Sequence, residues 1–152
     1  RSYDGPRSAP VWALATVWKH TLQRVLGLHR SFRYKVLPGI AVVSADVKLP
    51  SNTGEAGFWD RHRAFLEACR GTELYVKMPV DARTDPEEVR RGAALVSEAA
   101  PGAILYVQPL SDPDTSAWRI DMKRLAELAG VAAGQVHDTR VLPQIHKLVG
   151  VR

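Results

Sequence analysis

The chain has 152 residues, of which 45% are hydrophobic and 24% are charged, a composition typical of one globular domain. No run approaches the roughly 18 apolar residues of a membrane span, and the polar opening RSYDGPRSAP does not resemble a secretory signal. The single cysteine, Cys69, excludes an internal disulfide and a metal site made of cysteines alone, so we expect a cytoplasmic protein without a membrane partner.

The net charge of +5 is concentrated at one end of the chain. Residues 1–35 contain seven Lys or Arg and one Asp, a net charge of +6, whereas the remainder carries −1. A basic segment of this kind is able to bind phosphate. No aromatic stacking platform accompanies it, so nucleic acid is not the expected partner. We therefore treat residues 1–36 as a basic helical segment and residues 37–152 as the domain.

From residue 38 onward, apolar strands alternate with amphipathic helices. The patterns predict strands over 39–49, 73–80, 103–110 and 135–143, and a loop of Pro, Ser, Asn and Gly after the first strand. They predict helices over 55–70, 86–100 and 118–130. Asp85 and Pro86 are typical of a helix start, and Glu88 is expected to complete a capping box. The buried face of this helix is predicted to comprise Val89, Ala93, Val96 and Ala100.

Strand–helix alternation predicts an α/β fold, with a mostly parallel sheet and flanking helices. In such sheets the ligand site lies beyond the carboxyl ends of the strands. Polar residues gather at the carboxyl end of each predicted strand, while the rest of each strand is apolar. These residues are Asp46 and Lys48, then Lys77, then Gln108 and Ser111, and finally Gln144, His146 and Lys147.

Asp46 and Lys48 share one face of the first strand, because residues two apart do. This places an acid and a base where the sheet opens to a ligand. Simpler interpretations remain open. Asp46 and Lys48 pair only with each other, Lys77 is a solvated residue at the edge of the sheet, and Gln108 forms hydrogen bonds with the backbone of the following loop. His62 is expected to be a packed or rim histidine, and Cys69 a small buried hydrophobe.

Four segments in this order, DVKLPSNTGE, LYVKMPV, LYVQPL and RVLPQIHKLVGVR, resemble the C-terminal half of radical S-adenosylmethionine enzymes of the 7-carboxy-7-deazaguanine synthase type. The resemblance covers roughly residues 37–152. It implies a partial (β/α) barrel. It also implies a lyase that converts 6-carboxy-5,6,7,8-tetrahydropterin, a small-molecule substrate, to 7-carboxy-7-deazaguanine for queuosine biosynthesis. Because the family commonly dimerises, an uncovered strand edge would favour a homodimer.

The resemblance implies S-adenosylmethionine, a 4Fe–4S cluster and magnesium as cofactors. The residues it assigns to S-adenosylmethionine are Asp46, Val47, Lys48, Gln108 and Ser111. Those it assigns to the substrate are Gln144, His146, Lys147 and Arg152. No catalytic residue or metal ligand is assigned, because the three cluster cysteines of the family are absent from this chain.

The departure from the family leads to three hypotheses. The chain is a truncated, rearranged or fragmentary synthase homologue, inactive without the iron–sulfur half. Alternatively, it is a degenerate binding module without enzymatic activity, or an interaction protein that uses its basic segment. The second family considered is a glycyl-radical-enzyme activase, against which the terminal PQIHK argues.

Overall fold

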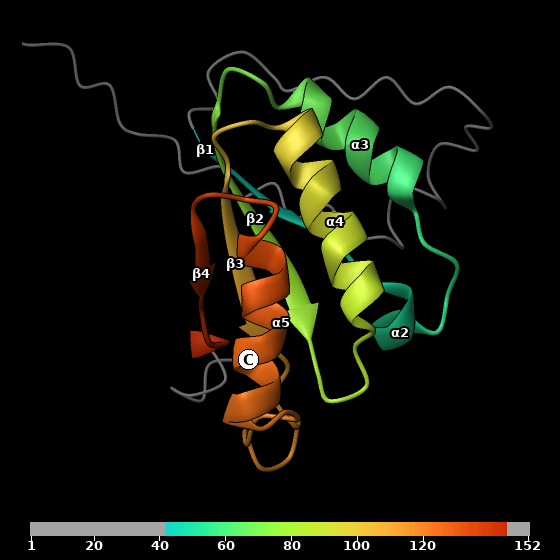
Figure 1. Ribbon diagram of the computed structural model, residues 1–152, viewed down its shortest axis with the longest axis vertical. Helices are drawn as coiled ribbons and strands as arrows, with labels where there is room; N and C mark the ends of the chain where they lie inside the picture. The colour runs from blue at the N-terminus through green and yellow to red at the C-terminus, as the bar shows by residue number, and fades with distance from the viewer. Residues whose placement is uncertain (1–41, 146–152) are drawn as a thin grey trace, which may run out of the picture.

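A computed structural model describes residues 42–145 of the chain (Figure 1). Strands and helices alternate along this part. The strands are β1 (Val42–Asp46), β2 (Glu73–Val80), β3 (Ile104–Pro109) and β4 (Thr139–Val141). The helices are α2 (Pro50–Thr53), α3 (Trp59–Ala68), α4 (Pro86–Ala99) and α5 (Met122–Ala133). None of these helices is long and apolar enough to cross a bilayer.

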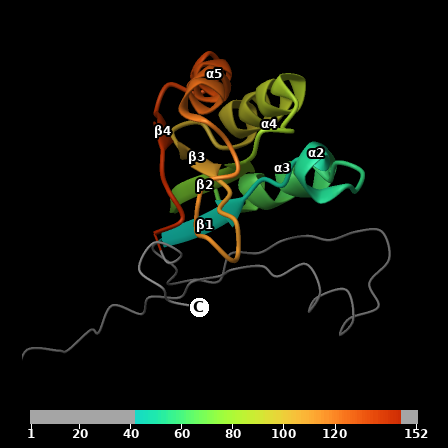
Figure 2. The ribbon, with the colours of Figure 1, turned by 90° about the horizontal axis from the view of Figure 1, so that it is seen from below.

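The four strands form one parallel sheet in the order β1-β2-β3-β4. Helices α3, α4 and α5 all lie on the same face of this sheet (Figure 2). Each strand therefore lies beside the one that precedes it in the chain, and the strand order never changes direction. This is the arrangement in the wall of a barrel, and it differs from a doubly wound sheet. The predicted α/β class is confirmed, and the arrangement is consistent with a partial barrel.

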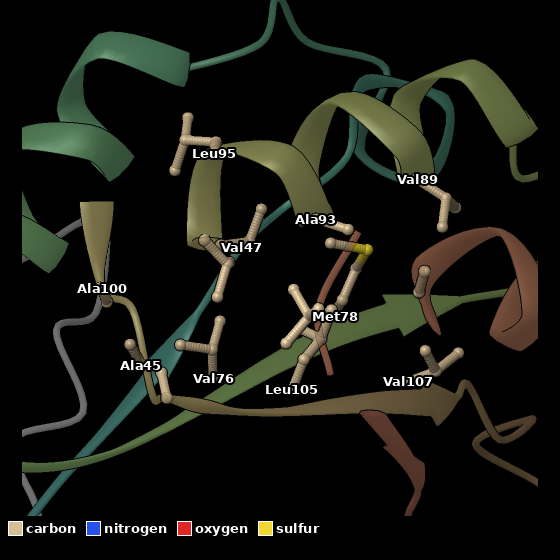
Figure 3. Close-up of a cluster of buried hydrophobic side chains, with 14 of the residues drawn as sticks. Ala45, Val47, Val76, Met78, Val89, Ala93, Leu95, Ala100, Leu105 and Val107 are labelled. Atoms are coloured by element: carbon tan, nitrogen blue, oxygen red, sulfur yellow. The ribbon is translucent and has the colours of Figure 1, made fainter. Parts of the chain in front are cut away.

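The core lies between the sheet and the helices, with α4 at its centre (Figure 3). The side chains with no exposed surface include Val76, Met78, Leu105 and Val107 from the sheet and Val89, Ala93 and Val96 from α4. All four residues predicted for the buried face of α4 are buried, as is Cys69. Burying a side chain of this size contributes about 1.5–3 kcal/mol, so this layer fixes the orientation of the sheet beneath it.

The start of α4 is as predicted, but the capping box is wrong. Asp85 caps the helix by accepting from the Glu87 backbone N–H at 2.9 Å. The Glu88 carboxylate does not bond back to the cap. It accepts instead from the backbone N–H and the hydroxyl of Ser51, at 2.9 and 2.6 Å, because α2 lies against this end of α4.

Several predicted boundaries are also wrong. Helix α5 begins at Met122 rather than Trp118, because Trp118 forms an antiparallel bridge with Ser111. It continues past Gly130 to Ala133, since Gly130 adopts helical geometry without a stop. The last strand is limited to Thr139–Val141, the residues paired with β3. The first strand ends at Asp46, before the helical turn α2 that was expected to be a loop.

Candidate functional site

The face of the sheet opposite the helices carries a row of polar and aromatic side chains. The register pairs Asp46 with Lys77, Lys77 with Tyr106, and Tyr106 with Arg140. Partners in parallel strands point to the same side, and the residues between them, such as Met78, point into the core. This open face is therefore chemically distinct from the dry face under the helices.

Three charged residues gather at the carboxyl end of β1 and beside it on β2, and we call them the Asp46 cluster: Asp46, Lys48 and Lys77. The two carboxylate oxygens of Asp46 each meet one ammonium, Oδ2 with Lys48 Nζ at 2.9 Å and Oδ1 with Lys77 Nζ at 3.1 Å. The alternative in which Asp46 and Lys48 pair only with each other is wrong, because Asp46 also pairs with Lys77. The cluster carries two positive charges and one negative charge.

The pKa of Asp46 lies below its ordinary value of 3.8. Burial is the largest single influence and raises the pKa, because it penalises the charged carboxylate. The charges of Lys48 and Lys77, and the hydrogen bonds they donate, together outweigh it. Asp46 is therefore a carboxylate at neutral pH, and the cluster keeps one net positive charge with which to attract an anion.

His62 of α3 lies beside the cluster rather than within it. Its Nε2 accepts from the Lys48 backbone N–H at 3.3 Å, which requires an unprotonated nitrogen. Burial, followed by the charge of Lys48, lowers the pKa of His62 below 6.5. The prediction of a packed or rim histidine is consistent with its half-buried position, and its neutral ring anchors the chain at Lys48.

The segment after Lys48 is fixed by long-range hydrogen bonds, which explains its Pro, Ser, Asn and Thr residues. Asn52 Nδ2 donates to the Pro79 carbonyl at 2.6 Å, and Asn52 Oδ1 accepts from the Thr84 hydroxyl at 2.7 Å. Ser51 adds the bonds to Glu88. Helix α2 is thus tied both to the end of β2 and to the start of α4, and it holds the carboxyl end of β1 in place.

Two of the residues assigned to S-adenosylmethionine differ in their orientation. The Val47 side chain is 1% exposed and lies in the core, so only its backbone is available at the rim. Gln108 follows Tyr106 by two positions and lies opposite Pro79 in the register, on the open face. Two strand spacings separate it from β1, about 10 Å.

Ser111 and Gln144, predicted for different ligands, are brought together. The Ser111 backbone N–H donates to Gln144 Oε1 at 3.0 Å, which ties the segment after β4 to the end of β3. Ser111 is 9% exposed, and its hydroxyl is the buried side-chain oxygen without a hydrogen-bond partner in the described part of the chain. The ends of β3 and β4 therefore form one polar edge.

Several predicted residues lie outside residues 42–145. They are His146, Lys147, Arg152 and the basic segment 1–36.

The implied iron–sulfur cluster does not fit this chain. Three thiolates would be required, and the sequence has only Cys69, which is buried at the end of α3. Burial raises the pKa of its thiol, which disfavours the thiolate that a metal needs. Within residues 42–145, no three His, Cys, Asp or Glu side chains are grouped to hold a metal ion, so we assign no magnesium ligand there.

Sequence reasoning missed two residues that matter for the site. Lys77 was read as solvated, although it stands opposite Asp46 in the register. Asn52 was read as part of a loop. The signal for Lys77 is its position in the strand that follows the strand ending in Asp-x-Lys. This position indicates a contact with Asp46 only once the register between the two strands is known. Asn52 carries no comparable signal, because its partners are 27 and 32 residues away.

Comparison with known proteins gives distant matches to one enzyme. The 7-carboxy-7-deazaguanine synthase of Geobacter sulfurreducens is 27% identical over 115 residues, which cover 76% of this chain and 46% of that protein. The enzyme of the same name from Methanopyrus kandleri is 36% identical over 112 residues, covering 71% of this chain and 39% of that protein. The chain thus spans less than half the length of these relatives. No family model matches, and no solved structure matches significantly.

Proposed function

We propose that this chain, a distant relative of part of 7-carboxy-7-deazaguanine synthase, binds S-adenosylmethionine at the Asp46 cluster. The observation that carries the proposal is the position of this cluster. A paired acid and base lie at the carboxyl end of β1, next to the edge where such sheets bind ligands, and Lys77 beside them on β2 leaves one surplus positive charge.

The charges of the cluster match the amino acid end of S-adenosylmethionine. The Lys48 ammonium is suited to the ligand carboxylate, and the Asp46 carboxylate to its ammonium. Gln108 lies about 10 Å across the open face, a separation that suits an extended nucleoside. Its amide is able to donate and accept, and we assign it to the nucleoside end. The Ser111–Gln144 edge lies beyond, and we assign the pterin substrate to that edge.

The chemistry of the whole enzyme is a separate part of the proposal. In the family that this chain resembles, S-adenosylmethionine supplies the radical that starts the reaction. The residues of this chain would bind and orient that cofactor. They provide no thiolates for a cluster, so we propose that the isolated chain binds S-adenosylmethionine without turning it over.

Calorimetry with the full chain and S-adenosylmethionine tests the binding site. Wild type is expected to bind, and Lys48→Met is expected to weaken binding about tenfold or more, since it removes a charge-assisted contact. Lys123→Met is the matched control, because Lys123 is exposed on α5. If wild type shows no binding, or if Lys48→Met binds as tightly as wild type, the site is wrong.

A degenerate binding module is the second candidate function, and the single cysteine favours it. Such a module would bind S-adenosylmethionine at the same site as the first candidate but would take no part in a radical reaction. The two candidates differ in whether the chain becomes active when the iron–sulfur half of the family is supplied as a second chain, whereas both predict inactivity of the isolated chain. Anaerobic reconstitution with iron and sulfide, followed by an assay for 5′-deoxyadenosine, tests that shared expectation on the isolated chain. We expect no product, and turnover by this chain alone would contradict our view that it is inert.

A further inference from the structure

The Asp46 cluster contains one more cation than the pair with Asp46 requires. Lys48 and Lys77 approach different oxygens of the same carboxylate, at 2.9 and 3.1 Å. A single lysine would suffice to neutralise Asp46. The second lysine therefore calls for an explanation in terms of what the cluster does when it meets a ligand.

The two lysines are held differently. Lys77 belongs to β2, with neighbours on both sides in the sheet, and its carbonyl accepts from the Val47 backbone N–H at 2.8 Å. Its side chain is 29% exposed. Lys48 follows the end of β1, and its side chain is 48% exposed. The Lys77 backbone is thus fixed within the sheet, and the Lys48 side chain is the more exposed of the two, so we expect Lys48 to be the one that changes partners.

We propose that Lys77 is a stationary counter-ion for Asp46, a positioning residue that allows Lys48 to leave Asp46 and bind the carboxylate of the ligand. The inference rests on the proposed function, because the ligand is S-adenosylmethionine. It adds different roles for the two lysines: Lys48 contacts the ligand, and Lys77 acts through Asp46.

The physical reason is the free-energy cost of leaving the Asp46 carboxylate without a positive partner. Asp46 is 31% exposed, and its partly buried carboxylate would lose compensation if its only partner turned to another anion. With Lys77 in place, one ion pair persists throughout. Asp46 also keeps the orientation in which its remaining lone pairs can accept from the ligand ammonium.

The first test needs no ligand. The pKa of the Asp46 carboxyl is measured by carbon-13 NMR in the full chain. Among residues 42–145, the ionisable groups that face it are Lys48, Lys77 and His62. In Lys48→Met, Lys77 still offsets part of the effect of burial, so the pKa is expected to stay below that of Lys48→Met/Lys77→Met. In the double variant, burial acts unopposed and the pKa is expected to rise above 3.8. Equal pKa values in the two variants would overturn the counter-ion role.

The second test measures coupling by calorimetry with S-adenosylmethionine. Lys77→Met is expected to weaken binding roughly tenfold, and Lys77→Arg to retain it. In an Asp46→Asn background there is no charge to compensate, so adding Lys77→Met should change the affinity less than twofold. An equal loss in both backgrounds would mean that Lys77 contacts the ligand or only supports the fold, and would overturn the inference. If wild type fails to bind, the proposed function fails, while the carboxyl titration still decides whether Lys77 compensates Asp46.

Discussion

Replacing Asn52 by alanine removes the two hydrogen bonds by which its side chain ties α2 to the end of β2 and to the loop before α4. The Pro79 carbonyl loses a donor at 2.6 Å, and the Thr84 hydroxyl loses an acceptor at 2.7 Å. Each bond contributes about 1 kcal/mol, and leaving a buried partner unsatisfied adds to the loss. Thr84 is 1% exposed, so we expect Asn52→Ala to lower the free energy of unfolding by about 2–3 kcal/mol.

Urea denaturation of the full chain, followed by circular dichroism, measures this change. With a slope of about 2 kcal/mol per molar, the midpoint should fall by about 1 M. Ser97→Ala on the exposed face of α4 is the matched control and should shift the midpoint little. If Asn52→Ala shifts the midpoint no more than the control does, the tether described here does not stabilise the chain.

Three further predictions concern the cap, the cluster and the core. Asp85→Ala removes the cap of α4 and should cost about 1 kcal/mol of unfolding free energy, whereas Asp60→Ala, which removes an exposed first-turn acid of α3, should cost clearly less in the same urea assay. Because the pKa of Asp46 is lowered from 3.8 when the chain folds, the contribution of its ion pairs is complete above pH about 4 and is lost as the pH falls through the lowered value. Asp46→Asn should therefore flatten the fall in stability below about pH 4, by at most about 1 kcal/mol for this partly exposed pair, and an unchanged acid slope would contradict the assignment. Gly92 of α4 packs against the sheet, and an added Cβ would lie 2.8 Å from Met78 Cε; Gly92→Leu should overpack the core and lower the thermal midpoint by several degrees, and an unchanged midpoint would refute this packing.

Elements whose limits are set by local chemistry were predictable from the sequence. The second strand occupies 73–80 as predicted, because β-branched and aromatic residues run between clear turn signals. The start of α4 follows from Asp85 and Pro86. In both cases the residues that determine the structure lie within a few positions of the boundary.

Elements set by distant contacts were not predictable. The short helix α2 depends on bonds from Ser51 to Glu88, 37 residues away, so Pro50–Thr53 looks like a loop in isolation. Trp118 has the spacing of a helix residue, but it pairs with Ser111. Such contacts exist only after the chain has folded, and no local pattern records them.

The candidate site was predictable in part for the same reason. Period-two spacing placed Asp46 and Lys48 on one face, and the pairing between them is present. The role of Lys77 depends on the register between β1 and β2, which a single sequence does not specify.

Amide NMR of the full chain, titrated with S-adenosylmethionine, tests the central claim most directly. The account predicts that signals of Lys48, Lys77 and Gln108 shift together at the open face, while those of exposed residues on α3 and α5 stay in place. Shifts confined to the helical face, or no shifts at millimolar ligand, would contradict it.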